Sequence, residues 1–445
     1  MIFGMFGKKP ADQGGGEDHD EDEEIELVSF QGALNGKSAD LQANAKLAQI
    51  GLIPAKEFVT DALSRRAEMV RIDIKGERAQ STISVDGVVY AGSRMPRPQA
   101  VAITQIMKLL AGLDPKNKAT TQQGGLKSDY EGHPWEISVE TTPQAEGVER
   151  LTLRFRDLKA KLNTLDELGF PGIVRQKIRE KTPNRKGLVI IAGPPGSGVT
   201  TTTFATIRGI DMYMYSCMSV ANLGSREIIN CTKFESQEGD SIVQTIARVQ
   251  RAEADVLFVD PIKDAEYAKT LVDNCDTLTL MAEMPAKDAA SAVAQLCAWV
   301  GDSAKVADAI QLVISSKLIR QLCEECKEAF RPNPKLLAKV GLPPETKVLY
   351  KKGEASVDEK TGQEGEPCGK CGGIGYYGRV AMLEMLEGTE EMKEVIKQSP
   401  TADAIKAQMR KEGMQTLQKD GLRLVVEGKT SLEELQRTFS SGNPQ

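Results

Sequence analysis

The sequence predicts an α/β protein whose central domain holds a mostly parallel β-sheet with helices on both faces. Apolar strands alternate with helical segments over residues 188–317, which is the pattern of such a sheet. A glycine-rich loop, GPPGSGVT at 193–200, follows the first of these strands directly and opens a helix. Two CxxC motifs, at 323–326 and 368–371, indicate a metal-binding segment after the sheet domain.

Length and composition indicate a folded protein of several domains. The 445 residues suffice for roughly two to four domains, and 40% hydrophobic with 27% charged residues is ordinary for a globular chain. A net charge of -6 gives no overall basic field. We therefore expect no direct binding to nucleic acid, and any contact with acidic lipid would have to be local.

The N-terminus and the cysteine content indicate a cytoplasmic protein. The opening segment MIFGMFGKKP is too short for the apolar core of a signal peptide, so the 8 cysteines are expected to be reduced thiols. No run approaches the roughly 18 apolar residues of a membrane span. Association with a membrane would therefore come through partner proteins.

The N-terminal 66 residues are expected to form a tail and a small helical cap. The like charges of EDHDEDEEIE at 17–26 repel each other, so we interpret 1–37 as a disordered acidic tail. Apolar residues recur at helical spacing over 38–66. Gly51 and Pro54 divide this stretch into two predicted short helices, which would form a cap or adaptor.

A small α+β domain is expected at 67–160, because its segments alternate in the manner of strands around one helical stretch at 97–113. Pro171 and Gly172 interrupt 161–187, which we interpret as a linker. The remaining expected parts follow in order along the chain. They are the P-loop domain at 188–317, a four-cysteine segment at 318–386 and a C-terminal helical region at 387–445.

The loop at 193–200 has the strand, loop and helix context of a phosphate-binding loop. Gly193, Gly196 and Gly198 would let backbone N–H groups approach anionic oxygens at the start of a helix, and Thr200 is placed to reach Mg²⁺. An ordinary glycine turn is the alternative. The candidate nucleotide-binding residues are Gly193, Pro194, Pro195, Gly196, Ser197, Gly198, Val199, Thr200 and Thr201.

Val199 stands where such a loop carries its phosphate-gripping lysine. An ammonium 4 Å from a phosphate oxygen contributes about 4 kcal/mol at an effective dielectric of about 20. Losing it would slow phosphoryl transfer roughly a thousandfold. Backbone amides alone could still hold a diphosphate weakly, so the sequence leaves binding of ATP and Mg²⁺ open.

The two CxxC motifs have the spacing of a structural zinc site. Four thiolates leave no open coordination position, and Gly369, Gly372 and Gly373 allow tight turns. A redox dithiol and unmetallated thiols are the alternatives. The predicted Zn²⁺ ligands are Cys323, Cys326, Cys368 and Cys371. The other thiols have no paired spacing and are interpreted as buried core cysteines, namely Cys217, Cys231, Cys275 and Cys297.

Several segments together resemble the GspE/PilB family of hexameric secretion and type IV pilus assembly ATPases. They are GPPGSGVTTTT at 193–203, ADVLFVDPIKDAE at 254–266, SSKLIRQLCEECKEAF at 315–330 and CGKCGGIGYYGRVAMLEML at 368–386, within a resemblance running from about Ala67 to Phe439. The resemblance implies a RecA-like P-loop NTPase domain and a PAS-like N-terminal domain. It also implies a homo- or hetero-oligomeric ring and partners in the inner-membrane secretion or pilus platform.

The first departure from this family lies after the Walker B strand. The family has Gly-Glu-Ile-Arg-Asp there, whereas this chain has DPIKD at 260–264. Pro261 thus occupies the position of the glutamate that would orient or activate water, a contribution of about 10² to 10⁴ in rate. Asp260 could hold a metal ion, or it could be a carboxylate at a strand-end turn.

Two further elements of the family are absent. The family's acidic Glu-Asp-Pro segment corresponds to CMSVANLGSRE at 217–227, which has no carboxylate before Glu227. The family's Leu-His-Thr-Asn-Asp-Ala strand corresponds to LMAEMPAKDAA at 280–290. The chain's only histidines, His19 and His133, lie elsewhere.

The family's basic residues that face the nucleotide are replaced by Thr82 and Ser84, whereas Arg251 and Arg320 match family arginines. These two arginines could be functional or structural. Loss of several chemical groups from a retained scaffold favours a degenerate ATPase that scaffolds or regulates at the cytoplasmic side of a secretion or pilus machine.

Two other hypotheses remain. The chain could be a working ATPase in which other groups, such as Lys263 or a partner subunit's arginine, replace those that are missing. It could also be an interaction module whose zinc knuckle binds nucleic acid, although only Tyr376, Tyr377 and Arg379 offer aromatic and basic groups there.

Overall fold

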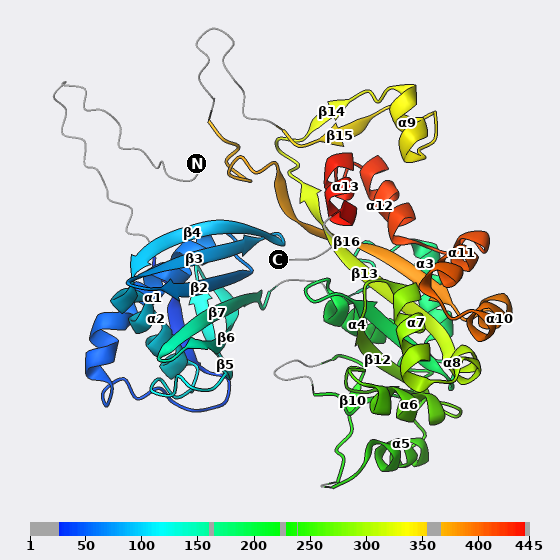
Figure 1. Ribbon diagram of the computed structural model, residues 1–445, viewed down its shortest axis with the longest axis horizontal. Helices are drawn as coiled ribbons and strands as arrows, with labels where there is room; N and C mark the ends of the chain where they lie inside the picture. The colour runs from blue at the N-terminus through cyan, green and yellow to red at the C-terminus, as the bar shows by residue number, and fades with distance from the viewer. Residues whose placement is uncertain (1–25, 160–163, 223–227, 238, 354–365, 441–445) are drawn as a thin grey trace. The chain divides into compact units, whose positions relative to one another are not determined.

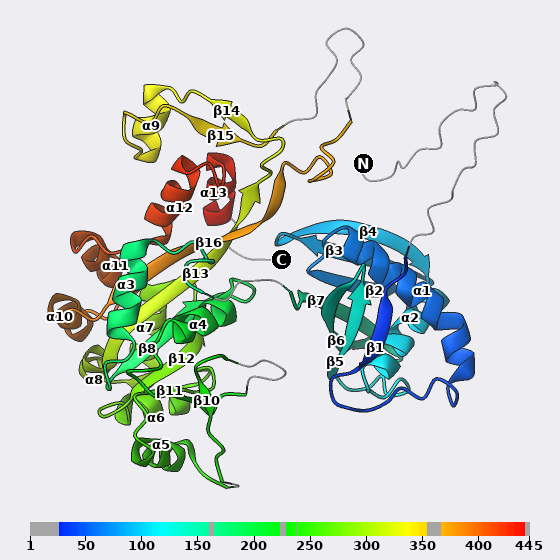
Figure 2. The same ribbon diagram turned by 180° about the vertical axis from the view of Figure 1, so that it is seen from behind.

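The computed structural model describes residues 26–159, 164–222, 228–237, 239–353 and 366–440. Figures 1 and 2 show the chain from opposite sides. Within these ranges no helix combines the length and the apolar character that crossing a membrane requires. The chain forms two compact units, one of Met1–Arg66, Ile72–Gln80 and Arg94–Leu158, and one of Ala67–Arg71, Ser81–Ser93 and Lys159–Gln445.

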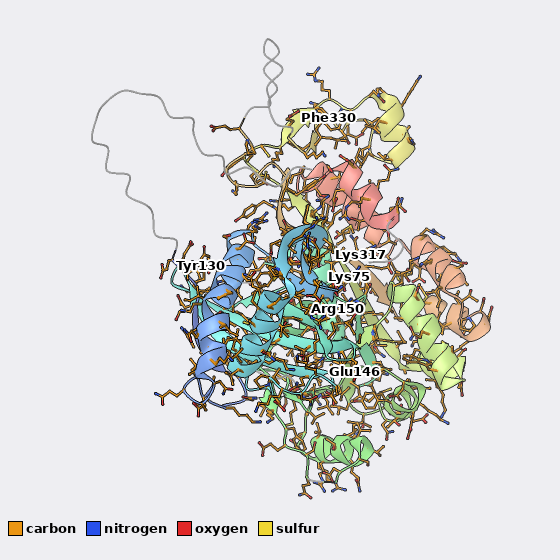
Figure 3. The ribbon with its side chains drawn as sticks, turned by 60° about the vertical axis from the view of Figure 1, so that its left-hand side comes forward. Lys75, Tyr130, Glu146, Arg150, Lys317 and Phe330 are labelled. Carbon is orange, nitrogen blue, oxygen red and sulfur yellow. The ribbon has the colours of Figure 1, made fainter. Side chains whose placement is uncertain are left out.

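The N-terminal sheet has seven strands in the order β1-β5-β6-β7-β2-β3-β4. Two helices accompany it, α1 (Ala45–Ser64) and α2 (Arg97–Leu110). Arg150 on the seventh strand, labelled in Figure 3, forms an ion pair with Asp73 on the second. The strands are β1 (Ser29–Ala33), β2 (Met69–Lys75), β3 (Arg78–Val85), β4 (Val88–Pro96), β5 (Gln122–Tyr130), β6 (His133–Ala145) and β7 (Val148–Asp157).

Two expectations for the N-terminal region are wrong. Residues 29–33, expected in the disordered tail, form β1, which pairs antiparallel with β5; residues 1–25 lie outside the described ranges. The cap is one continuous helix, α1, with Pro54 inside it. Gly51 does not break α1 but lets it approach α2, since an added Cβ would lie 3.0 Å from the Ala102 carbonyl oxygen.

The second sheet has the order β10-β9-β11-β12-β8-β13-β16. In the described part of the chain its neighbouring strands pair in parallel, except for the edge strand β16, which pairs antiparallel with β13. This confirms the expected parallel sheet. The strands are β8 (Leu188–Gly193), β9 (Cys217–Ser219), β10 (Thr232–Lys233), β11 (Val256–Phe258), β12 (Thr279–Pro285), β13 (Ile310–Leu322) and β16 (Tyr376–Glu387).

Helices cover both faces of this sheet, and strand β8 is therefore buried on both sides. Leu188 and Ile190 join one core with helices α6 and α7, whereas Val189 and Ile191 join another with α3 and α4. Figure 1 looks onto α7, and Figure 2 looks onto α3. The helices are α3 (Gly172–Lys181), α4 (Val199–Arg208), α5 (Ile242–Arg251), α6 (Ala265–Asp273), α7 (Ala289–Val300) and α8 (Ser303–Ala309).

The C-terminal part of the chain adds to this sheet and covers it. Strands β13 and β16 run across residues 317 and 386, so the sheet continues into the expected four-cysteine segment. Between them lie β14 (Glu328–Phe330), α9 (Pro334–Val340) and β15 (Leu349–Lys351). The expected helical region contains α10 (Glu390–Gln398), α11 (Ala402–Lys411), α12 (Leu417–Val426) and α13 (Leu432–Ser440).

Candidate nucleotide site and metal site

The glycine-rich loop connects β8 to α4 in the conformation that its glycines permit. Gly196 has a φ of 78° and Gly198 a φ of 86°, a left-handed region that a residue with a Cβ adopts only with strain. The Ser197 N–H donates to the Pro194 carbonyl oxygen at 3.1 Å, and the Thr202 N–H donates to that of Gly198 at 2.9 Å. The backbone is therefore folded as a strand, loop and helix around the predicted residues.

The side chain of Val199 packs back against the beginning of the loop. A Cβ added to Gly193 would lie 2.2 Å from Ser197 Oγ, 2.7 Å from Val199 Cγ2 and 3.0 Å from the Ser316 carbonyl oxygen. Val199 also contacts the apolar core on the α4 side of the sheet. The Val199 side chain thus fills space inside the loop. A lysine at position 199 would have to point out of this space to reach a phosphate.

Strand β13 supports the loop from the other side. The Ser316 hydroxyl donates to the Ser197 carbonyl oxygen at 3.2 Å. Ser197 is buried, and within the described ranges its hydroxyl has no hydrogen-bond partner. The loop therefore presents one buried polar atom that a bound ligand could satisfy.

Sequence reasoning missed Glu283, which lies on β12 beside the loop. Strand β12 pairs with β8, placing Glu283 opposite Ile191. The Thr200 hydroxyl donates to Glu283 Oε2 at 3.2 Å. Glu283 interrupts the apolar run LMAEM at 280–284, and a carboxylate inside a buried strand was the available signal.

Asp260 follows β11 and is exposed. Its carboxylate accepts the Asn222 backbone N–H at 2.9 Å and so fastens the segment after β9. Burial, and next the charge of Asp260, raise the pKa of Tyr267. These contacts match the alternative of a strand-end carboxylate, while the hydroxyl predicted to reach Mg²⁺ is held by Glu283.

Arg320 has a structural environment. Its guanidinium lies 2.7 Å from Glu434 Oε2 and 4.1 Å from the centroid of the Tyr376 ring. Glu434 is 1% exposed and also pairs with Arg437. Burial alone would raise the pKa of Glu434, but hydrogen bonds from Arg437 and Arg320 outweigh it and lower that pKa. The other matching arginine, Arg251, is exposed at the end of α5.

The four predicted ligand cysteines come together. Their Sγ atoms all lie within 4.8 Å of one another. The Cys323–Cys368 and Cys326–Cys371 Sγ separations are 3.9 and 3.7 Å. A tetrahedral zinc ion with Zn–S bonds of about 2.3 Å would have S···S edges of about 3.8 Å.

Backbone N–H groups favour the thiolate form of Cys368, whereas burial raises the pKa of Cys323 and of Cys326. The Gly375 N–H donates to Cys371 Sγ at 3.2 Å. The backbone N–H groups of Cys371 and then Lys370 lower the pKa of Cys368 to about 7. The donor set and its geometry therefore fit a structural zinc ion.

Comparison with known proteins decides the family. A family model described as "Type II/IV secretion system protein" matches residues 44–437. The chain belongs to this family. It is a family of secretion and pilus-assembly ATPases, as the relatives described next also indicate.

The family's curated members include pilus and secretion proteins. The type IV pilus assembly ATPase PilB of Thermus thermophilus is 28% identical over 383 residues, 85% of this chain and 42% of that protein. PilB of Myxococcus xanthus is 26% identical over 85% of this chain and 66% of its own length. The type II secretion system protein E of Pseudomonas aeruginosa is 25% identical over 85% of this chain and 73% of its own length. The chain thus spans about two fifths to two thirds of the PilB relatives.

Solved structures agree on the fold. The ATPase DotB of Legionella pneumophila aligns over 86% of this chain and 94% of its own, with a TM-score of 0.54 and 14% identity. The pilus retraction motor PilT with bound ADP aligns over 87% and 97%, with a TM-score of 0.51 and 16% identity. The predicted α/β fold with a RecA-like P-loop domain is confirmed.

Proposed function

We propose that this chain is a catalytically degenerate member of its family, a subunit that scaffolds or regulates a secretion or pilus-assembly machine. The observation that carries the proposal is Val199 packed into the loop against Gly193. The loop keeps the backbone of a phosphate site, but no ammonium is offered at this position. Pro261 likewise offers no carboxylate for activating water.

Compared with a phosphate-binding loop that carries a lysine, this loop has a more negative charge, which disfavours a nucleotide. Val199 supplies no positive charge, and the Glu283 carboxylate lies at the Thr200 hydroxyl. Each unit charge about 4 Å from a phosphate oxygen changes the interaction by about 4 kcal/mol at an effective dielectric of about 20. A nucleotide at this loop would therefore need a divalent cation to offset the carboxylate.

Some of the residues at the loop are suited to bind Mg²⁺ together with a nucleotide. Thr200 and Glu283 would supply oxygen ligands of the kind that Mg²⁺ prefers, and the loop backbone would hold a diphosphate. Mg²⁺ would neutralise phosphate charge there. Asp260, the other candidate metal ligand, is held by the Asn222 amide.

The proposed structural zinc ion would hold Cys323, Cys326, Cys368 and Cys371 together beyond the sheet. Tyr377 is 38% exposed, but a nucleic-acid role for this cluster would rest on that ring alone, because Tyr376 is 2% exposed and lies against Arg320. The Tyr376 hydroxyl is 2.8 Å from that of Ser431. The Tyr376 ring has no free face on which a base could stack.

We further propose, from the family, that the chain assembles with itself or with an active relative as a ring at the cytoplasmic side of the inner membrane. Its partners there would be platform proteins of the secretion or pilus system. The relatives named for type IV pilus assembly and for type II secretion support both settings equally.

The test is ATP binding by calorimetry and phosphate release by the purified chain, alone and with a catalytic relative. We expect weak or no binding and no turnover. Val199→Lys should tighten ATP binding by about tenfold or more through its added charge, with little hydrolysis because Pro261 remains. Val199→Met, similar in length but neutral, should not. Turnover of about one per second by the unmodified chain would contradict the proposal.

A working ATPase is the second candidate, and the contact between Thr200 and Glu283 is the observation that favours it. Glu283 would then serve as a relocated carboxylate that holds Mg²⁺ or orients water. In that case the unmodified chain should hydrolyse ATP, and Glu283→Gln should abolish that turnover. Under the degenerate proposal, Glu283→Gln should instead tighten nucleotide binding measured without Mg²⁺, because it removes a negative charge beside the phosphates.

A further inference from the structure

Two cysteines interpreted as unpaired core residues lie against each other. The Sγ atoms of Cys217 and Cys231 are 3.5 Å apart. Cys217 begins β9, and Cys231 directly precedes β10. Residues 218–230 separate them in sequence, so no CxxC-like spacing reveals the pair.

The strand register explains the approach. Strands β9 and β10 are parallel neighbours, with Thr232 opposite Met218 and Lys233 opposite Ser219. Cys231 and Cys217 occupy the preceding position of the same register. Neighbouring strands lie about 4.8 Å apart. Disulfides span Cα separations of about 4.4 to 6.8 Å, a range that includes the usual spacing of neighbouring strands.

We propose that Cys217 and Cys231 form a thiol modification site that a low-molecular-weight disulfide, such as oxidised glutathione, converts reversibly to an intramolecular disulfide. The Cys231 thiolate attacks one sulfur of the reagent, forms a mixed disulfide and releases one thiolate. Cys217 then loses its proton and attacks the Cys231 sulfur, releasing the second thiolate. The protein loses two electrons and two protons, and the reagent becomes two thiols.

The two sulfurs differ in the way that this order requires. Cys231 is half-buried, whereas Cys217 is 5% exposed. Cys217 Sγ donates a hydrogen bond to Cys231 Sγ, which lowers the pKa of Cys231 and raises that of Cys217. The attacking thiol is thus the more accessible and more acidic one.

The sheet domain contains its own controls. Burial raises the pKa of Cys275 to about 12 and that of Cys297 to about 11. Both are buried, and Cys275 Sγ donates to the Val272 carbonyl oxygen at 3.3 Å. These two thiols should react far more slowly than Cys231.

The disulfide would act on the β10 edge of the sheet, which three strands separate from β8 and its loop. The segment after β9 includes Asn222, whose N–H donates to Asp260. A covalent bond between β9 and β10 would close the segment that carries this contact into a ring. Oxidation would therefore stiffen the backbone that holds Asp260.

The experiment treats the full, zinc-saturated chain with oxidised glutathione, blocks remaining thiols and maps tryptic peptides without reduction. Trypsin cleaves after Arg226, so Cys217 and Cys231 fall in separate peptides, 209–226 and 227–233. We expect these two peptides to be linked at a level about tenfold above any link to Cys275 or Cys297. Dithiothreitol should reverse the link.

Two variants test the order of the steps. Cys217→Ser should accumulate glutathione on Cys231, whereas Cys231→Ser should leave Cys217 unmodified. The proposal would be overturned if the folded wild-type chain gave no linked peptide although Cys275, Cys297 or Cys231 alone reacted with glutathione. Circular dichroism of each variant checks that the sheet domain remains folded.

Discussion

The phosphate loop and the four-cysteine cluster border the same strand but differ in what they retain. Ser316 in the middle of β13 holds the loop, and Cys323 follows the end of β13. The loop keeps its glycines and its backbone path, whereas the side chain for phosphate chemistry is absent. The cluster keeps all four ligands at separations that suit zinc.

This difference teaches which groups the fold itself needs. Gly193 has no space for a Cβ, so packing requires it, and Gly196 and Gly198 have left-handed backbones, so the path of the loop requires them, whether or not a nucleotide binds. The cysteines likewise act in folding if they hold a metal. A lysine at position 199 would contribute to phosphate binding and catalysis, and the loop folds without it.

The largest test of the comparison is Cys371→Ser. The variant should lose zinc and lose order around the cluster, since a structural zinc ion contributes about 10 kcal/mol to folding in small domains. Zinc content by mass spectrometry and hydrogen exchange of 323–353 measure the two effects. Cys297→Ala, outside the cluster, should keep full zinc. Normal zinc content in Cys371→Ser would contradict a four-thiolate site.

The next test is Glu434→Ala, which leaves Arg320 buried without its partner. We expect a loss of about 3–5 kcal/mol in the free energy of unfolding, measured with denaturant at pH 7. Arg437→Ala, removing the exposed partner, should cost less than about 1 kcal/mol. Equal losses of unfolding free energy in the two variants would show that Glu434 does not stabilise the buried charge of Arg320.

Glu434 also gives this test a pH dependence. Its pKa is lower folded than unfolded, so its stabilisation is complete above the unfolded value of about 4.3. That stabilisation is lost as the pH falls through the folded pKa. The difference between wild type and Glu434→Ala should therefore shrink below about pH 4.

The smallest test sharpens the view of the loop as retained packing. Gly193→Ala should cost about 1–3 kcal/mol of unfolding free energy, because the new Cβ overlaps Ser197 and Val199. In a Val199→Ala background the same change should cost less, with a coupling energy of about 1 kcal/mol. Strict additivity would mean that Val199 does not occupy the space beside Gly193.

Much of the fold and of both sites could be predicted from local signals. The run LVIIAG at 188–193 is apolar on both faces, and β8 is buried between two helical layers. The glycine spacing predicted the loop. The CxxC spacing predicted a cluster that closes over a long excursion.

What could not be predicted depends on pairing between distant segments. The strand β1, SFQGA, has no apolar alternation and forms because it pairs with β5. From the sequence, Gly51 is predicted to break the helix. In the structure it is the position where α2 packs closely against α1. Glu283 reaches Thr200, and Cys231 reaches Cys217, only because the sheet order brings β12 beside β8 and β10 beside β9.

The long ladder between β13 and β16 has a consequence for how quickly the chain folds. Residues 323–375 lie between these strands and must be looped out before Leu322 can pair with Tyr376. The cysteine cluster joins the two ends of that excursion beside this first pair. Metal binding there would replace a long loop closure by a short one, lowering the entropic barrier to strand pairing. Refolding with zinc should therefore be faster than refolding with a chelator, as stopped-flow fluorescence can measure.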